Sequence, residues 1–331
     1  MKTMFEHKPE IEKQIHAILD EVKKEYEKHF WADEVIEQIK KLATSGKLVR
    51  GCLIVHNAKL LGRIPDKKMY KAAAALEIYH TGILIHDDVM DQDNYRRGQR
   101  TIHKYIEDEY GDKKFGESIA ITTGDMLFFV STHITSEIVN ESTLKTIGAV
   151  SKDFIATCFA QMDDVYFPLT QEVPVNRILD MYKYKTARYT FSLPFKMSCI
   201  AAKKPSQELE EIGEILGMIF QLKDDEIGLI GKETGKSDYN DIVQNKKTLH
   251  RHIAYQELGD QLDKYFGKNI SEQEAREVKK LMKEAKVFEK VQDIMNEKAS
   301  EAKEKIEKAN VQEDHKDFLK NLLRYNLTRQ K

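Results

Sequence analysis

The chain has 331 residues, of which 33% are charged, while glycine (16) and proline (6) are scarce. This composition favours a helical protein with well-solvated outer faces. The formal net charge of −2 gives no basic excess for nucleic-acid binding, and no run of about 18 apolar residues is present that could insert stably into a membrane. Cys52, Cys158 and Cys199 are widely spaced in apolar sequence, so we expect reduced core thiols in a cytoplasmic protein.

Apolar residues at helical spacing predict an amphipathic helix over residues 10–41. The break at Ser45-Gly46 would separate it from a second helix over residues 47–61. A third helix is expected over residues 66–93, and its middle, residues 72–85, is apolar on nearly every face. Such a helix should lie at the centre of the fold.

The rest of the chain continues the helical pattern. Further helices are expected over residues 115–140, 143–166, 176–202 and 207–230. Residues 231–246 are rich in Gly, Asp, Asn and Lys and indicate a functional loop, after which two or three charged amphipathic helices would complete the chain. With no strand-period alternation of useful length, the sequence predicts a single all-α domain over residues 1–331.

Two acidic pairs lie inside apolar helical sequence: Asp87-Asp88, with Asp91 one turn later, and Asp224-Asp225. Positions i and i+4 share a helix face, so Asp87 and Asp91 should point the same way. Their repulsion and desolvation would be costly unless a cation lay between them. Oxygen ligands without His or Cys favour Mg²⁺, which takes its remaining ligands from water and substrate phosphate. A surface ion-pair cluster is the alternative.

Basic residues accompany the first acidic pair. His80 precedes Asp87 by seven residues and should share its face about 10 Å away along the axis. A histidine alone is more often a hydrogen-bonded core residue, and only this register with Asp87 favours a site residue. Arg96-Arg97 follows the acids, and arginine binds phosphate oxygens with paired hydrogen bonds. A diphosphate held between metal ions and arginines is therefore predicted. Asp224 lies 137 residues beyond Asp87, so only tertiary structure could unite the clusters. Two helices that present the acids across a bundle cavity would do so.

With these residues in view, the chain resembles the trans-isoprenyl diphosphate synthases of the polyprenyl synthetase family. The first aspartate motif is DDVMD at Asp87–Asp91, followed by RRG at Arg96–Gly98, and the second is FQLKDDEIG at Phe220–Gly228. Other matches, in the expected order across residues 45 to 250, are Gly46-Lys47-x-x-Arg50, Gly124-Asp125, Gln161-x-x-Asp164, Lys185-Thr186 and Lys246-Lys247-Thr248.

The resemblance implies an all-α, single-domain helical bundle around a deep central cavity, of the isoprenoid synthase type. It also implies a Mg²⁺-dependent prenyltransferase that joins isopentenyl diphosphate head-to-tail (1'-4) to an allylic diphosphate, which would be dimethylallyl, geranyl or farnesyl diphosphate. About three Mg²⁺ ions would serve each active site. By the same resemblance the enzyme is expected to be a cytoplasmic homodimer.

The resemblance also assigns roles to individual residues. The expected metal ligands are Asp87, Asp88, Asp91, Asp224 and Asp225. The expected clamp on the allylic diphosphate comprises Arg96, Lys185, Lys246 and Lys236. The expected isopentenyl diphosphate site comprises Lys47, Arg50, His80 and Arg97. Residues expected near the allylic cation are Thr186, Phe220 and Gln221.

The chain departs from the family pattern in two of its motifs. The usual GGKRxRP is SGKLVRG here, so Leu48 replaces the middle arginine and Gly51 replaces the proline. Gly228 replaces the third aspartate of the second motif. These changes motivate an alternative, a non-catalytic subunit of a heteromeric prenyl synthase. A terpene cyclase is a further alternative, but it would not need the second diphosphate site that Lys47 and Arg50 predict.

The residues that precede Asp87 are expected to set the product length. In the resembled enzymes the prenyl chain grows beside this helix, and one isoprene unit is about one helical turn long. Gly82 should offer no obstruction, Ile83 a partial one and Tyr79 a large ring one turn deeper. These three residues predict a C20 product, with C15 and C25 as its neighbours.

The chain's last residues are basic. Arg329 and Lys331 would fold over a bound diphosphate if the resemblance extends to them, but a frayed terminus is the default expectation.

Overall fold

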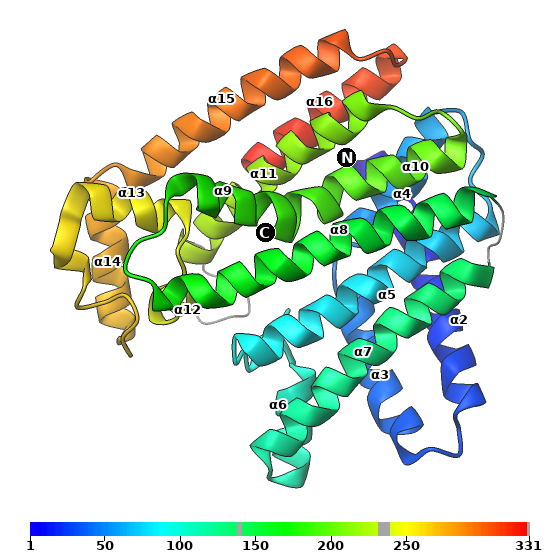
Figure 1. The fold of residues 1–331 in the computed structure, drawn as a ribbon, viewed down its shortest axis with the longest axis horizontal. Coiled ribbons are helices and arrows are strands. Elements are labelled where there is room, and N and C mark those ends of the chain that lie inside the picture. The colour runs from blue at the N-terminus through cyan, green and yellow to red at the C-terminus, as the bar shows by residue number, and fades with distance from the viewer. Residues whose placement is uncertain (138–140, 231–238, 330–331) are drawn as a thin grey trace. The chain divides into compact units, whose positions relative to one another are not determined.

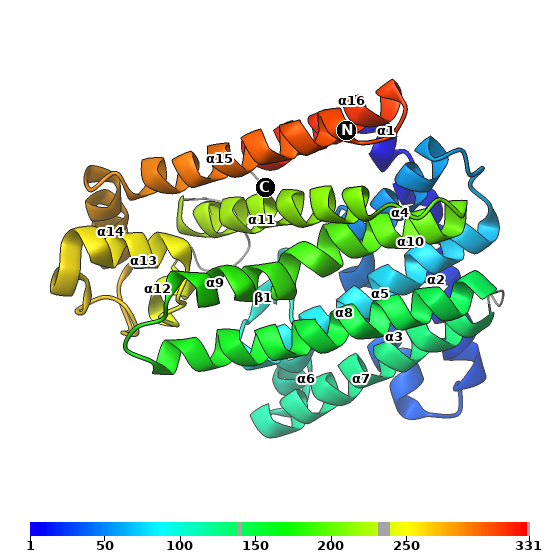
Figure 2. The same cartoon turned by 45° about the horizontal axis from the view of Figure 1, so that its top comes forward.

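The computed structural model describes residues 1–137, 141–230 and 239–329. They form two compact units, with Met1–Ala149 and Pro194–Pro205 in unit 1 and Val150–Leu193 and Ser206–Lys331 in unit 2. Both units consist almost entirely of helices, so the all-α class is confirmed (Figures 1 and 2). The single domain expected from the sequence stays a prediction.

Unit 1 is built around one long helix. Its elements are α1 (Lys2–Phe5), α2 (Lys8–Glu25), α3 (Phe30–Thr44), α4 (Val49–Leu60), α5 (Lys67–Met90), β1 (Tyr95–Arg96), β2 (Gln99–Arg100), α6 (Ile102–Tyr110), α7 (Lys113–Glu137) and most of α10 (Leu193–Ala202). α5 begins where the Asp66 carboxylate accepts a hydrogen bond from the Met69 N–H at 2.9 Å. It packs against α2, α3, α4 and α7, so the prediction of a central helix is confirmed for this unit (Figure 1).

The single helix expected over residues 10–41 is wrong, because the structure has two helices there. α2 ends at Glu25 and α3 begins at Phe30, and the residues between them are exposed. The break lets α3 turn back and pack on α2, so that apolar stripes such as Ile11 and Ile15 on α2 and Ile36 on α3 are buried. Helical periodicity alone did not reveal the turn, since neither glycine nor proline marks it.

Two further elements of unit 1 were not predicted. The strands β1 and β2 form a two-residue antiparallel hairpin in which Arg96 pairs with Gln99. The helix α6 follows Thr101 and ends at Gly111, whose φ of +72° is the left-handed conformation typical of a helix C-terminus. The hairpin places Arg96 beside the acidic end of α5.

Unit 2 contains the second acidic pair. Its elements are the greater part of α8 (Glu141–Tyr166), η1 (Phe167–Leu169), α9 (Val175–Tyr182), η2 (Lys183–Ser192), α11 (Gln207–Ile230), α12 (Asn240–Val243), α13 (Leu249–Leu258), η3 (Gly259–Leu262), α14 (Glu272–Glu284), α15 (Val287–Lys308) and α16 (Glu313–Thr328). α11 lies against η2, α15 and α16, and Figure 2 shows α15 and α16 running beside it.

The helix expected over residues 176–202 contains a wide π segment, η2, in its middle. Pro194 follows this segment and lacks the N–H that an α-helix would use there. Gly217 of α11 allows a close approach, because a Cβ at this position would lie 2.7 Å from the Ala187 carbonyl oxygen. Such segments are frequent at functional sites, and η2 carries Lys185 and Thr186.

One expectation about the cysteines is wrong. Cys52 and Cys199 are buried, but Cys158 is exposed. It lies on α8, whose buried face is formed by residues such as Phe154, Thr157 and Ala160, so position 158 is turned outward.

The buried His250 of α13 gives unit 2 a pH-dependent stability. Its side chain is fully buried, and neither ring nitrogen has a hydrogen-bond partner among the described residues. Burial, with a smaller effect of Lys223, lowers the pKa of His250 to about 3. Because the unfolded chain binds this proton near pH 6.5, the stability from a neutral His250 is complete above that pH and is lost as the pH falls towards 3.

We therefore expect the free energy of unfolding to fall by about 3–5 kcal/mol between pH 7 and pH 3.5 on account of His250. Urea unfolding at a series of pH values checks this. His250→Leu should flatten the curve, whereas the exposed His16→Gln should not. Equal acid sensitivity in wild type and His250→Leu would contradict the prediction.

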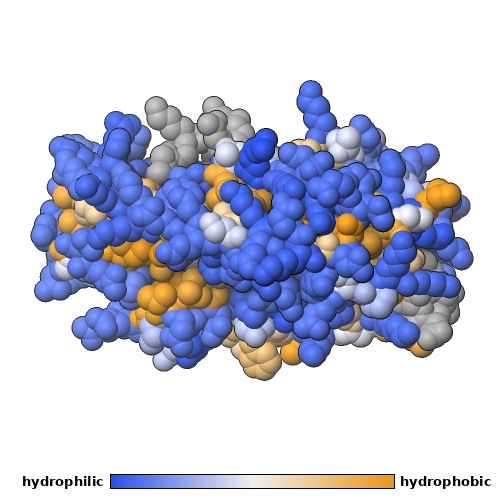
Figure 3. Space-filling model, turned by 90° about the horizontal axis from the view of Figure 1, so that it is seen from above, coloured by the Kyte–Doolittle hydropathy of each residue, from blue (hydrophilic) through white to orange (hydrophobic). Residues whose placement is uncertain are grey.

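The face shown in Figure 3 is mostly hydrophilic, in keeping with the high charged fraction of the chain. Within the described residues, no helix combines the length and the hydropathy that crossing a membrane requires.

Candidate active site

The first acidic pair lies on the last turn of α5 and is bound by one arginine. Nη2 of Arg96 lies 3.0 Å from Asp87 Oδ2 and 3.7 Å from Asp93 Oδ2, and its Nε donates to Asp88 Oδ1. The Asp87 side chain is 16% exposed and that of Asp88 only 1%. Asp91 is the C-cap of α5, immediately after these residues.

This arrangement supplies the counter-charge that the sequence required for the acidic pair. Burial by itself would lower the pKa of Arg96, but the charges of Asp88 and Asp87 outweigh burial and raise it. Arg96 therefore stays protonated beside the carboxylates. Its expected role in binding diphosphate stays a prediction, since in this structure its guanidinium contacts the acids.

A second group of residues surrounds His80, earlier on α5, and its positive charges are those of Arg50 and Arg97. His80 is 6% exposed, and burial, followed by the charges of Arg50, Arg97 and Arg96, holds the pKa of this histidine well below its usual value. The guanidinium of Arg97 lies against the backbone of Gly46, where a Cβ would clash with it. The structure thus brings Arg50, His80 and Arg97 together beside the Gly46 backbone, and Lys47 is the next residue in the chain.

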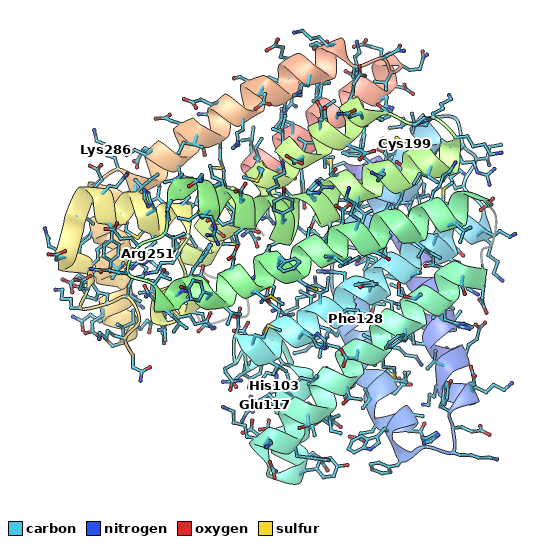
Figure 4. All side chains as sticks on the ribbon, in the orientation of Figure 1. His103, Glu117, Phe128, Cys199, Arg251 and Lys286 are labelled. Carbon is cyan, nitrogen blue, oxygen red and sulfur yellow. The ribbon has the colours of Figure 1, made fainter. Side chains whose placement is uncertain are left out.

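The predicted chain-length residues lie beside a ring that the sequence did not single out. Tyr79 stacks on Phe128 of α7 with ring centroids 4.6 Å apart, and Phe128 is labelled in Figure 4. A Cβ at Gly82 would lie 2.8 Å from Phe128 Cε1 and 2.9 Å from the Gly124 carbonyl oxygen. Glycine at position 82 therefore lets α7 approach α5, and Phe128 fills the space expected to be open.

The second acidic pair lies near the end of α11, and its two members differ. The Asp224 side chain is 55% exposed, and Oδ1 accepts a hydrogen bond from Arg329 Nη2 at 2.6 Å. The same guanidinium donates to the Phe220 carbonyl oxygen at 3.0 Å and lies 3.7 Å from the centre of the Phe220 ring. The default expectation of a frayed terminus is thus wrong for Arg329, while Lys331 lies outside the described residues.

Asp225 points into the interior instead. Tyr182 donates a hydrogen bond to its Oδ2, and Gln221 Nε2 donates to its Oδ1 at 2.7 Å. Burial, together with the charges of Asp241 and Asp224, raises the pKa of Asp225 well above its usual value despite these bonds. Tyr182 also accepts a hydrogen bond from the Leu249 N–H at 2.8 Å. Of the pair, Asp224 is the residue accessible to an ion.

Two predicted lysines meet on one carboxylate oxygen. Oδ2 of Asp164 accepts from Lys185 Nζ at 2.6 Å and from Lys246 Nζ at 2.8 Å. Burial would raise the pKa of Asp164, but the two ammonium groups outweigh burial and lower it. Asp164 therefore holds both lysines together in unit 2. Thr186 follows Lys185 in η2, and Lys236 lies outside the described residues.

Asp241 of α12 lies near the position at which the second motif lacks its third acid. A Cβ at Gly228 would lie 3.4 Å from Asp241 Oδ2. A carboxylate is thus present beside Gly228, although it comes from thirteen residues further along the chain. Nothing in the residue spacing linked the two positions, because the contact depends on how α12 packs beside α11.

The donor set suits Mg²⁺. Asp87, Asp88, Asp91 and Asp224 offer only carboxylate oxygens, which this ion prefers. Within the described part of the chain, no three acidic, histidine or cysteine side chains converge to enclose an ion. Because Mg²⁺ usually keeps several waters and completes its shell with substrate phosphate, one or two carboxylates per ion are sufficient.

The comparisons with known proteins agree with these motifs. The sequence pattern described as polyprenyl synthetase matches residues 31–287. A geranylgeranyl diphosphate synthase of Sulfolobus acidocaldarius is 32% identical over 215 residues, a match that spans 62% of each chain. A geranylgeranyl diphosphate synthase of Methanosarcina mazei is 30% identical over 270 residues, or 79% of each chain.

Solved structures show the same fold. The geranylgeranyl pyrophosphate synthase of Corynebacterium glutamicum, solved with isoprenyl diphosphate and magnesium, superposes with a TM-score of 0.92 over 99% of both chains at 20% identity. A farnesyl diphosphate synthase of T. brucei gives a TM-score of 0.84 over 98% of this chain and 100% of that chain, at 19% identity. From the extent of the sequence match and the order of its motifs, we conclude that the chain belongs to the polyprenyl synthetase family.

Proposed function

We propose that the chain catalyses the Mg²⁺-dependent 1'-4 condensation of isopentenyl diphosphate with an allylic diphosphate, giving a C20 prenyl diphosphate. The observation that supports this most strongly is the arrangement along α5, where a carboxylate group at Asp87 and Asp88 follows a cationic group around His80. The acids suit a metal-bound diphosphate and the cations suit a second diphosphate bound without metal. A terpene cyclase would need only the first.

In this proposal the chain binds two diphosphates with different residues. The carboxylates of Asp87, Asp88, Asp91 and Asp224 would hold three Mg²⁺ ions on the allylic diphosphate. Since both oxygens of Asp225 are already hydrogen-bonded, we assign Asp224 direct contact and Asp225 a supporting position. Arg96, Lys185, Lys246 and Lys236 bind the same diphosphate, while Lys47, Arg50, His80 and Arg97 bind isopentenyl diphosphate.

The reaction begins as the allylic C–O bond breaks, leaving an allylic cation and a diphosphate anion. Mg²⁺ held by the acids would supply positive charge for the departing diphosphate. Lys185 and Lys246 add fixed positive charge there, and the Asp164 oxygen keeps both ammonium groups in place. The double bond of isopentenyl diphosphate then attacks the cation, a C–C bond forms, and the released diphosphate takes the proton that is lost.

The intermediate cation has to be kept from water. Phe220, Gln221 and Thr186 offer a π-face and oriented dipoles for this purpose. Gln221 is held by its bond to Asp225, and Phe220 lies against Phe191 with ring centroids 5.3 Å apart. These contacts leave little freedom to either side chain, so the Phe220 ring and the Gln221 amide dipole are preorganised.

The test is to incubate the purified chain with isopentenyl diphosphate, an allylic diphosphate and Mg²⁺, and to separate the products by chromatography. Dimethylallyl, geranyl and farnesyl diphosphate are supplied in separate reactions. We expect geranylgeranyl diphosphate to accumulate and EDTA to abolish its formation. No product without a partner protein would favour the non-catalytic subunit, and a cyclic hydrocarbon would favour a cyclase.

We expect Tyr79→Ala to lengthen the product from C20 to C25 or beyond, because it removes a ring one turn below Gly82. Phe128→Ala should lengthen it as well, since the two rings stack on each other. Product chromatography with farnesyl diphosphate as primer measures the change. Phe129→Ala is the matched control, because this neighbouring ring is 76% exposed. An unchanged product length in Tyr79→Ala would show that Tyr79 does not limit the length of the prenyl chain.

We also propose a homodimer that forms through the exposed face of α8. Ile155, Phe159, Met162 and Tyr166 recur at steps of three or four residues, and each is at least 58% exposed. A continuous apolar stripe of this kind on a helix indicates an interface. Phe159→Glu should therefore give a monomer in light scattering, whereas Lys303→Glu, at an exposed position of α15, should leave the dimer intact. A monomeric wild type would contradict the proposal.

The free thiols of Cys52, Cys158 and Cys199 support a reducing, cytoplasmic location as part of this proposal.

A further inference from the structure

The helix α4, which carries Arg50, begins without a cap of its own. Leu48 is its N-cap residue and makes no side-chain hydrogen bond to the helix. Leu48 has a φ of +52° and is 4% exposed, so its side chain packs in the core and does not cap the helix. The first N–H groups of a helix have no partner within the helix and need another acceptor.

Glu77 of α5 supplies that acceptor from another helix. The Gly51 N–H donates to Glu77 Oε1 at 2.7 Å, and the Arg50 N–H also hydrogen-bonds this carboxylate. The Glu77 side chain is buried, with only 3% of its surface exposed. A carboxylate at a helix N-terminus is also favoured by the helix dipole. Sequence spacing did not single out Glu77, because the contact joins residues 26 positions apart.

Glu77 also lies among the positive charges expected to bind isopentenyl diphosphate. Burial raises its pKa, while the charges of Arg50 and Arg97 act in the opposite direction. Arg97 and Arg50 in turn repel each other electrostatically. A buried carboxylate that attracts both offsets that repulsion, and His80 follows it by one turn on the same helix.

Gly51 makes this contact possible. A Cβ here would lie 3.2 Å from Ile11 Cδ1, 3.3 Å from the Ala73 carbonyl oxygen and 3.3 Å from Glu77 Cγ, so glycine lets α4 approach α5 closely. The resembled motif has proline at this position, and proline has no N–H to donate. The departure at Gly51 therefore adds a hydrogen bond that the usual motif lacks.

We propose that Glu77 is a positioning residue for the isopentenyl diphosphate site, which caps α4 from α5 and thereby fixes Arg50 beside His80 and Arg97. The inference rests on the proposed function. It assigns a specific role to a residue outside the family's diphosphate-binding motifs, and it gives a structural reason for one of the chain's departures from them.

The test compares Glu77→Leu, which removes the acceptor, with Glu77→Gln, which keeps an amide oxygen. We expect Glu77→Leu to raise the KM for isopentenyl diphosphate about tenfold, with kcat and the KM for farnesyl diphosphate changed less than about threefold. Glu77→Gln should recover most of the loss. Thr81→Val is the control, because it also changes a buried polar side chain on α5. The Thr81 hydroxyl donates to the backbone carbonyl oxygen of Glu77 in its own helix, at 2.8 Å, and not to the Glu77 carboxylate. An unchanged KM for isopentenyl diphosphate, or an equal rise for both substrates, would overturn the proposal.

A second pair of variants tests the donor and remains informative if Glu77→Leu fails to fold. Gly51→Pro removes the N–H within the first turn, where proline is tolerated, and Gly51→Ala keeps the N–H while adding the tight Cβ. We expect a larger KM for isopentenyl diphosphate in Gly51→Pro than in Gly51→Ala. Equal KM values would overturn the proposed hydrogen bond. A wild type that forms no prenyl product would instead refute the proposed function, so the two failures are distinguishable.

Discussion

Asparagine in place of Asp224 should lower kcat about 10²–10³-fold, because it removes a charged ligand from the site where the leaving diphosphate gains charge. The free energy of unfolding should change by about 1 kcal/mol or less, since the Asp224 side chain is 55% exposed and its ion pair with Arg329 is partly solvated. Steady-state kinetics and urea unfolding measure the two effects separately.

The control for this variant is Asp293→Asn, which changes an exposed carboxylate on α15. It should leave both kcat and stability unchanged. A raised Mg²⁺ concentration should restore part of the Asp224→Asn activity, because a weakened ion site can still be filled by mass action. If Asp224→Asn retained full activity at limiting Mg²⁺, Asp224 would not be a ligand.

Replacing Asp164 by asparagine should have the second large effect. One Asp164 oxygen pairs with both Lys185 and Lys246, and its side chain is 9% exposed. Removal of one partner from a buried charge network costs about 3–5 kcal/mol, because the other charges are left uncompensated. The free energy of unfolding should fall by that amount, and kcat/KM for the allylic substrate should fall about 10²-fold as the two ammonium groups separate.

Asp163→Asn is the matched control for this prediction, since it makes the same carboxylate-to-amide change in the neighbouring acid. Asp163 pairs with Arg177, which is 52% exposed, so its loss should cost less than about 1 kcal/mol.

The pKa of Asp164 is lowered, so its stabilising effect is present above the unfolded pKa and disappears as the pH falls below about 4. Equal stabilities of the two variants at pH 7 would contradict the role of Asp164.

The sequence sufficed for the fold class and for the central helix of unit 1, because α5 is apolar on nearly every face and apolar periodicity is a local property. It did not reveal the break between α2 and α3. The exposed residues there are compatible with helix, and only the packing of α3 back on α2 decides the matter. The short helix α6 was overlooked, although Thr101 before it and Gly111 after it are ordinary helix boundary signals.

The candidate site was predictable where motifs identify residues, and unpredictable where distant residues meet. Spacing singled out Asp87 and Asp224, and the family resemblance singled out Lys185. Nothing in the spacing linked Asp164 to Lys246, 82 residues away, or Arg329 to Asp224, 105 residues away. The buried position of Asp225 was equally hidden, because which of two adjacent acids faces inward depends on the register of α11 against η2.

The most direct test of the account measures metal binding in the presence of substrate diphosphate. Free Mn²⁺, a paramagnetic substitute for Mg²⁺, is followed by electron paramagnetic resonance while wild type, Asp87→Asn and Asp224→Asn are titrated with an unreactive thio-linked farnesyl diphosphate. We predict that the analogue strengthens Mn²⁺ binding to the wild type at least tenfold, and that either substitution removes most of this gain, because the proposed function assigns both acidic pairs to one metal-bound diphosphate. A wild-type gain retained in full by Asp224→Asn would contradict the account.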